Sequence, residues 1–366
     1  MTTPIKILHV EAGRNLYGGA LQVLYLIKGL QESRHDNVLV CPEQSEIAAH
    51  AHETGARIHA IPMRGDFDLP FIGRLRQIIA REQPDIVHLH SRRGADVLGG
   101  IAARLAHAKV VLTRRVDNHE SSLQVRLKYR LFDKVIAISG GIRNILISEG
   151  VPAEKVVCVR SAIDIKQYSL SCADAWFRKE FGLAQDVRVI GMVAQFIERK
   201  GHRYLLQAIP GILSKYPRVK FILFGKGPLE EGIRAMALAA GMQSSLLFAG
   251  FRNDLERVLP CLYAIVHPAE MEGLGVALLQ AAACRVPLVG TDTGGIPEIV
   301  IDGVDGYLIP PRSPQAIAAA VLKLLDDPVK ARAMGEAARA IVEKEFSIDA
   351  MVAGNLGVYR ELMDTL

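Results

Sequence analysis

Glycines gather directly after several short apolar runs of this sequence, where backbone amides could bind a phosphate group. Because glycine has no Cβ, the backbone can approach a ligand closely, and a helix that follows presents free N–H groups to an anion. Each glycine taken singly is equally well explained as a turn residue. The surrounding sequence must therefore distinguish a phosphate-binding loop from an ordinary turn. The glycines concerned are Gly13, Gly18, Gly19, Gly225, Gly227, Gly273, Gly275, Gly294 and Gly295.

Two enzyme classes that use glycine-rich loops lack their required residues here. A dehydrogenase needs G-x-G-x-x-G, but the first apolar run continues as EAGRNLYGGA, and no third glycine follows Gly225 and Gly227 at the right distance. The hydrolase pattern G-x-S-x-G is absent. Asp66 and Asp68 have the spacing of metal ligands, but their loop offers no third oxygen ligand, so we expect no metal site.

The elements that must position these loops are short apolar runs separated by helical patterns. This alternation predicts an α/β fold in which helices cover parallel sheets. Ligands of doubly wound sheets bind beyond the carboxyl ends of the strands, where the glycines stand. The expected strands are 5–10, 37–41, 57–62, 85–90, 109–113, 134–139 and 156–160, then 188–194, 219–225, 246–250, 264–269, 287–292 and 306–310.

Length and a break in this alternation predict two domains. A chain of 366 residues suits two cores of ordinary size. The alternation stops after Ile163 and begins again near Arg188. We therefore predict two Rossmann-like domains, over 1–165 and 166–345, that face a cleft.

Composition indicates a folded protein of the cytoplasm. Half of the residues are hydrophobic, yet no apolar run reaches the roughly 20 residues that span a bilayer, and the first residues read as a strand. The five cysteines are scattered and form no C-x-x-C pair. We interpret them as reduced thiols.

Positive charge is concentrated between residues 85 and 143, where eleven Lys or Arg face five acids. This excess fits a phospholipid surface, a phosphorylated acceptor or nucleic acid, or simply a solvated face. Nucleic acid is the weakest of these, because aromatic residues make up only 6% of the chain and do not alternate with the basic ones. Leu123, Leu127 and Leu131 share one helical face beside basic residues, which fits peripheral contact with an anionic membrane as well as packing on the sheet.

The longest ordered pattern lies between residues 264 and 300, where Pro268, the segment 272–275 (EGLG), Pro287 and the segment 294–298 (GGIPE) follow one another. This pattern resembles the retaining family 4 glycosyltransferases of the GT-B fold. In that family a turn with proline ends a strand, a Glu-Gly-Phe-Gly-like segment opens a helix, and Gly-Gly-x-Pro-Glu follows the next strand. The resemblance extends to the family's Arg-x₄-Lys-Gly loop, its Gly-x-Gly-Pro turn and its Asp-Val-Val-His-x-His strand. The matching stretches are Pro268, 272–275 (EGLG), Pro287, 294–298 (GGIPE), 195–201 (QFIERKG), 224–228 (FGKGP) and 85–91 (DIVHLHS).

The resemblance implies which residues contact a nucleotide-sugar donor. A leaving diphosphate carries about two to three negative charges, which an enzyme without a metal must meet with cations and helix N-termini. Lys200 matches the family's diphosphate-binding lysine, Glu272 the acid that touches the sugar hydroxyls, and His119 a histidine that faces the donor sugar. We expect these three to be catalytic, and we interpret His90 as a packing and hydrogen-bonding residue. The expected donor-binding set is Gly18, Gly19, Gln195, Lys200, Gly225, Gly227, Leu274, Gly275 and Gln280.

Two positions depart from the family pattern and lose charge. Gln280 stands where a second Glu grips the ribose hydroxyls, and Gln195 stands where an arginine usually meets the diphosphate. An amide accepts a weaker hydrogen bond than a carboxylate. A lost cation at about 4 Å removes at most a few kcal/mol of attraction. The alternative to an active enzyme is therefore a weak or inactive nucleotide-binding relative that acts in glycan assembly.

The resemblance thus predicts a retaining, metal-independent glycosyltransferase. It implies a nucleotide diphosphate sugar as donor, UDP-linked because UDP is common in the family, and a glycan or lipid-linked acceptor of cell-surface polysaccharide or lipopolysaccharide assembly. No cofactor and no nucleic acid partner are expected, and the protein would work in the cytoplasm at the inner face of the membrane. Residues 346–366 resemble the family's last helix, which packs back on the first domain. An epimerase or a phosphorylase on the same fold is a further alternative.

Overall fold

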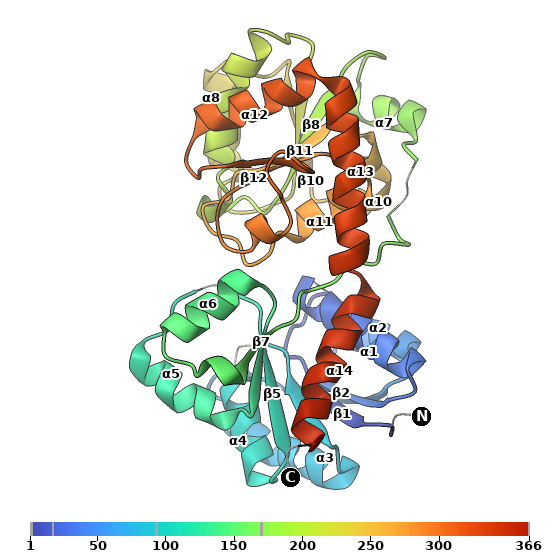
Figure 1. Ribbon diagram of the computed structural model, residues 1–366, viewed down its shortest axis with the longest axis vertical. Coiled ribbons are helices and arrows are strands. Elements are labelled where there is room, and N and C mark those ends of the chain that lie inside the picture. Colours follow the sequence, from blue (N-terminus) through green and yellow to red (C-terminus); the bar gives the residue numbers. More distant parts are fainter. Residues whose placement is uncertain (1–2, 17, 92–93, 117, 169–170, 365–366) are drawn as a thin grey trace. The chain divides into compact units, whose positions relative to one another are not determined.

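The computed structural model describes residues 3–16, 18–91, 94–116, 118–168 and 171–364, which divide into two compact units (Figure 1). Unit 1 combines residues 1–162 with 348–366, and unit 2 comprises residues 163–347. Each strand expected from the sequence is present, and both units have the predicted α/β architecture. No described helix is long and apolar enough to cross a bilayer.

Unit 1 is built on a parallel sheet whose strand order is β3-β2-β1-β4-β5-β6-β7. Its inner strands are almost entirely buried because helices cover both faces, and they are mainly apolar apart from His9 and His88. The strands are β1 (Lys6–Val10), β2 (Asp36–Pro42), β3 (Arg57–Ile61), β4 (Ile86–Leu89), β5 (Lys109–Arg114), β6 (Lys134–Ala137) and β7 (Val156–Cys158). The helices are α1 (Gly18–Glu32), α2 (Glu46–Ala51), η1 (His52–Thr54), α3 (Pro70–Glu82), α4 (Val97–Leu105), α5 (Ser122–Lys128), η2 (Tyr129–Leu131), α6 (Gly140–Ser148) and η3 (Ala153–Lys155).

The last helix, α14 (Ile348–Asp364), belongs to unit 1 and lies beside α1 (Figure 1). Gly29 of α1 permits this close packing, because a Cβ there would lie 2.5 Å from a methyl group of Val352. The fully buried Tyr359 extends the contact to the sheet, where its hydroxyl bonds with Nδ1 of His88 at 2.6 Å. The end of the chain therefore completes the core of the first unit.

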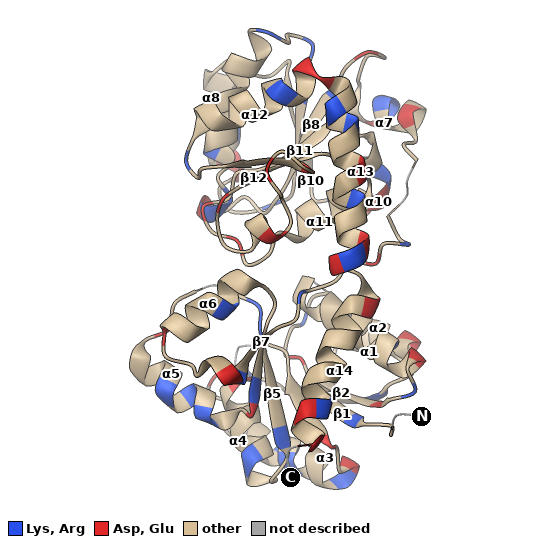
Figure 2. Cartoon of the chain, viewed as in Figure 1, with Lys and Arg blue, Asp and Glu red and all other residues tan. Residues whose placement is uncertain are grey.

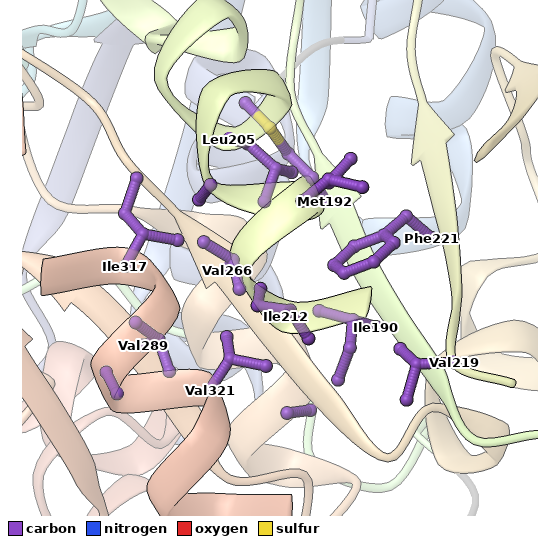
Figure 3. Packing of buried hydrophobic residues seen from close by; sticks show 14 of the residues in the cluster. Ile190, Met192, Leu205, Ile212, Val219, Phe221, Val266, Val289, Ile317 and Val321 are labelled. Carbon is purple, nitrogen blue, oxygen red and sulfur yellow. The ribbon is translucent and has the colours of Figure 1, made fainter. Parts of the chain in front are cut away.

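Unit 2 repeats the architecture with the strand order β10-β9-β8-β11-β12-β13. Ile190 and Val266 of the sheet pack against Ile212, and Val321 covers them from a second helix (Figure 3). The strands are β8 (Val189–Val193), β9 (Lys220–Phe224), β10 (Leu246–Gly250), β11 (Ala264–His267), β12 (Leu288–Thr291) and β13 (Gly306–Ile309). The helices are α7 (Asp174–Phe181), η4 (Glu198–Lys200), α8 (His202–Leu213), α9 (Glu230–Ala239), α10 (Leu255–Val258), η5 (Leu259–Cys261), α11 (Val276–Ala283), η6 (Ile296–Glu298), α12 (Pro314–Asp326) and α13 (Pro328–Glu345).

Both sheets reverse their strand order at one place, between β1 and β4 in unit 1 and between β8 and β11 in unit 2. The chain leaves the two neighbouring strands in opposite directions there, so a crevice opens beyond their carboxyl ends. Ligand sites of doubly wound folds lie at such positions. The loops after these four strands are therefore where functional side chains should meet.

One expectation about the cysteines was wrong. Cys172 and Cys261 form a disulfide within unit 2, although we interpreted all five cysteines as reduced. The two residues are 89 positions apart in the sequence, so no local spacing could signal the bond. The fold brings the segment before α7 alongside η5 and places the two Cα atoms 4.8 Å apart. Cys41, Cys158 and Cys284 are free thiols.

Candidate active site

The side chains of Lys200 and Glu272 form an ion pair at the strand reversal of unit 2. Lys200 ends η4 after β8, and Glu272 lies in the loop after β11. Gly201, with φ of 71°, makes this approach possible, because a Cβ there would lie only 2.0 Å from the carbonyl oxygen of Pro268. The two charged side chains are 12% and 13% exposed, so they are mostly withdrawn from water but still reachable.

Glu272 is held from several directions. Nε2 of His267 lies 2.7 Å from its carboxylate, and the N–H of Gly295 donates to its carbonyl oxygen at 3.1 Å. Gly294 is required beside it, since a Cβ at that position would lie 1.8 Å from the same carbonyl oxygen. Burial alone raises the pKa of the Glu272 carboxyl, but His267 and Lys200 outweigh burial and hold the pKa far below its ordinary value. The group is therefore a carboxylate at neutral pH.

The N-terminus of α11 lies close to this ion pair. Gly275 adopts φ of 98° and directly precedes the helix, and Cγ of Glu272 lies 3.7 Å from where its Cβ would be. Leu274 is 2% exposed, so its backbone rather than its side chain can face a ligand. The first N–H groups of a helix lack partners within it and carry partial positive charge. A cation, a carboxylate and a helix N-terminus are thus combined in one small region.

Gln195, Gly225 and Gly227 lie in the loops after β8 and β9. A Cβ on Gly225 would lie 1.9 Å from the carbonyl oxygen of Ala194, and one on Gly227 would lie 2.6 Å from that of Phe196. Both glycines are therefore needed for the two loops to pack together. The side chain of Gln195 is exposed.

Gln280 lies within α11, and its side-chain Nε2 donates a hydrogen bond to the hydroxyl of Tyr168. This contact joins α11 to the segment that opens unit 2. Tyr168 comes from the segment that opens unit 2, and no sequence pattern pointed to it.

The other predicted site residues, Gly18, Gly19 and His119, belong to unit 1. Gly18 and Gly19 open α1, and a Cβ on Gly19 would lie 3.5 Å from Cδ of Arg115. The His119 side chain is 74% exposed, and its Nδ1 lies 2.8 Å from the Glu149 carboxylate.

Unit 1 contains a cavity of about 250 Å³ at its own strand reversal. Glu11, His90 and Arg115, which follow β1, β4 and β5, line it. Sequence reasoning did not select Glu11 or Arg115. The available signal was a charged residue directly after the first strand for Glu11, and a pair of arginines at the end of the fifth strand for Arg115.

Two groups of residues bear on a metal ion. One ring nitrogen from each of His9, His88 and His90 lies within 4.8 Å of the other two, a grouping that sequence analysis did not foresee. Asp68 of the suspected acidic pair instead accepts a hydrogen bond from Arg74 at 2.6 Å and one from the N–H of Arg64 at 2.9 Å. Asp68 thus has a structural role.

Comparison with known proteins identifies the class of enzyme. Residues 175–341 match the family described as Glycosyl transferases group 1, and residues 17–167 match Glycosyltransferase Family 4. The chain is a glycosyltransferase with the GT-B fold. Crystal structures confirm the fold of this glycosyltransferase: Anabaena HepE in complex with UDP and glucose has a TM-score of 0.83 at 22% identity over 99% of this chain and 100% of that one.

Curated relatives of the glycosyltransferase act on different substrates. It is 25% identical to N-acetyl-alpha-D-glucosaminyl L-malate synthase of Bacillus anthracis over 85% of this chain and 84% of that protein. It is 27% identical to the GDP-mannose-dependent alpha-(1-6)-phosphatidylinositol monomannoside mannosyltransferase of Mycolicibacterium smegmatis over 88% of this chain and 89% of that protein. These names agree on glycosyl transfer and differ in donor and acceptor.

Proposed function

We propose that this glycosyltransferase binds a nucleotide diphosphate sugar in unit 2 and transfers the sugar with retention of configuration and without a metal ion. The observation that carries the proposal is the Lys200–Glu272 ion pair beside the N-terminus of α11. Lys200 and the helix N-terminus meet the diphosphate, and Glu272 accepts hydrogen bonds from hydroxyls of the donor sugar. Fixed charges of this kind stabilise the leaving diphosphate because they need no reorganisation as its charge grows.

The ion pair also compensates the two charges of the site. Two buried charges without partners would cost several kcal/mol each, so Lys200 and Glu272 neutralise each other until the donor arrives. The diphosphate then takes over the contact with Lys200. His267 keeps the Glu272 carboxylate in place through its bond of 2.7 Å.

His119 is the proposed residue that faces the donor sugar. Its bond to Glu149 fixes one ring nitrogen, and its high exposure leaves the other side of the ring open. In a retaining mechanism without a protein nucleophile, such a residue would orient the donor and stabilise positive charge on the sugar ring.

The acceptor is proposed to be a glycan or a lipid-linked molecule of cell-surface polysaccharide or lipopolysaccharide assembly, reached at the inner face of the membrane. Exposed leucines of α5, Leu123 and Leu127, support a membrane contact, and basic residues accompany them on this helix (Figure 2). Leu131 does not extend this face, because its side chain packs closely against Gly100 of α4. We propose UDP as the carrier of the donor sugar.

Turnover separates an active enzyme from an inactive nucleotide-binding relative. The enzyme should release nucleoside diphosphate from a nucleotide sugar when cell-surface glycan extract is added, and proton NMR of the product should show the donor's anomeric configuration. Binding without release would favour the inactive relative. An inverted product would overturn the retaining mechanism.

A further inference from the structure

His267 ends β11 and shares one oxygen atom of Glu272 with Lys200. Nε2 of His267 lies 2.7 Å from Oε2 of Glu272, and the ammonium group of Lys200 contacts the same oxygen. The His267 side chain is only 2% exposed, whereas that of Glu272 is 13% exposed. His267 is therefore a buried residue that acts on a ligand through Glu272 rather than by direct contact.

The hydrogen bond to Glu272 determines the tautomer of His267. A carboxylate only accepts hydrogen bonds, so Nε2 of His267 carries a proton and donates it. In the neutral ring Nδ1 is then unprotonated. This nitrogen is buried and has no hydrogen-bond partner among the residues that the structure describes. Nδ1 is consequently the position at which His267 can add a second proton.

Burial and two neighbouring cations keep His267 neutral in the free protein. Burial lowers the pKa of His267, and the charges of Lys200 and Arg199 lower it further, while the Glu272 carboxylate opposes them. The nearby His202, the first residue of α8, is also neutral at pH 7. Burial, with a smaller effect of His267 and Lys200, lowers its pKa to about 4. The groups that act on His267 are thus one carboxylate, two cations and a neutral imidazole.

Donor binding changes the charges around this imidazole. In the proposed function the diphosphate takes over the contact with Lys200, and its negative charge offsets the cation that disfavours protonation of His267. Glu272 is then left as a mostly buried carboxylate without its lysine partner, which is unfavourable. Both changes raise the pKa of His267. A proton on Nδ1 makes the ring a cation and gives Glu272 a charged partner through the hydrogen bond that already exists.

We propose that His267 is a positioning residue that takes up a proton when the donor binds, so that an imidazolium replaces Lys200 as the partner of Glu272. The proton comes from the solvent and adds to Nδ1. It returns to the solvent when the nucleoside diphosphate leaves and Lys200 pairs with Glu272 again. The carboxylate thus keeps its charge and its position for the sugar hydroxyls while Lys200 contacts phosphate. This inference rests on the proposed function, since it concerns the same donor site.

Proton uptake gives donor binding a definite pH dependence. The bound protein carries more protons than the free protein, so its affinity for the donor rises as the pH falls between the two pKa values of His267. The affinity for UDP-glucose should increase about threefold or more from pH 7.5 to pH 6. Titration calorimetry of the full-length protein measures this change. An affinity that stays constant or decreases toward pH 6 would overturn the proposal.

The number of protons taken up can be measured in the same way. Calorimetry at pH 7 in Pipes, Hepes and Tris, whose ionisation enthalpies differ, gives the protons taken up per UDP-glucose bound. The diphosphate of UDP-glucose is esterified at both ends and does not itself titrate near neutral pH. We expect an uptake between about half a proton and one proton. Binding without uptake would refute the role of His267 alone, whereas no binding of either UDP-glucose or GDP-mannose would contradict the proposed function and this inference with it.

Two substitutions assign the proton to His267. His267→Gln retains a side-chain N–H that can donate to Glu272 but cannot add a proton. We expect this variant to bind UDP-glucose without proton uptake and with an affinity that does not rise toward pH 6. His202→Gln is the matched control, because it removes the neighbouring buried imidazole and should leave the uptake in place. Uptake that persists in His267→Gln, or is lost in His202→Gln, would show that another group takes the proton. Should a variant not fold, the titrations of the unaltered protein still test the proposal.

Discussion

Lys200 and Glu272 lie 72 residues apart in the sequence, yet their side chains form an ion pair at the strand reversal of unit 2. Two short connections create this contact, one from β8 through η4 and one from β11 to α11. The close approach of Gly201 to Pro268 holds the connections together. The pair is therefore a product of the backbone rather than of two flexible side chains.

Removal of the cation should damage catalysis more than folding. We expect Lys200→Ala to lower kcat/KM about 100-fold, because it removes the principal cation beside a diphosphate that gains charge as the bond breaks. Lys344→Ala is the matched control, since that lysine is 82% exposed and pairs with the neighbouring Glu345. Steady-state kinetics should give kcat/KM for both variants. A loss below threefold for Lys200→Ala would remove Lys200 from the site.

The depressed pKa of Glu272 predicts a specific acid sensitivity. The folded-state pKa lies below the ordinary value of 4.5, so ionised Glu272 stabilises the fold above that pH, and this contribution is lost as the pH falls below it. The unfolding free energy should therefore drop less between pH 7 and pH 3.5 in Glu272→Gln than in the unaltered protein. Urea titrations at both pH values measure the difference. An equal drop of the unfolding free energy in the two proteins would show that the pKa of the Glu272 carboxyl is not lowered.

Chelators should leave the transfer rate unchanged, because charge stabilisation is assigned to Lys200 and the α11 N-terminus. The measurement is the initial rate before and after dialysis against EDTA. Restoration of a lost rate by manganese would contradict the metal-independent mechanism. Restoration by zinc would indicate a metal site at His9, His88 and His90, which are grouped in unit 1.

The exposed leucines of α5 predict binding to anionic vesicles. The protein should float with anionic but not with neutral liposomes, and high salt should release it, since screening weakens the attraction of basic residues to lipid. Leu123→Ser combined with Leu127→Ser should reduce flotation severalfold. Leu238→Ser, at an exposed leucine of α9 in unit 2, is the matched control. Equal flotation with both kinds of liposome would contradict the proposed contact of this surface with anionic lipid.

The strands could be predicted from the sequence, whereas contacts between residues far apart in the chain could not. The strands were predictable, because buried parallel strands such as β4 and β11 are short, mainly apolar runs. The proximity of Lys200 and Glu272 was implied only by the family pattern, since periodicity carries no information across 72 residues. The Cys172–Cys261 bond and the contact of Gln280 with Tyr168 were missed for the same reason.

The unit 1 cavity was beyond sequence reasoning for a different reason. Hydrogen bonds join His90 to His9 and His9 to Asn37, and these residues come from the end of β4, from β1 and from β2. Contacts between separate strands have no local sequence signal.

Nucleotide binding by the unaltered protein and by two charge-restoring variants tests the central claim, a donor site in unit 2, most directly. UDP, GDP, ADP and CDP should be compared by thermal melting. A ligand at a hundredfold excess over its Kd adds about 2.7 kcal/mol of stability, and we expect UDP to give the largest shift. Gln195→Arg should tighten UDP binding but not uridine binding, whereas Gln280→Glu should tighten both through the ribose. If no nucleotide shifts the melt and neither substitution creates binding, the donor site assigned to Lys200 and Glu272 is contradicted.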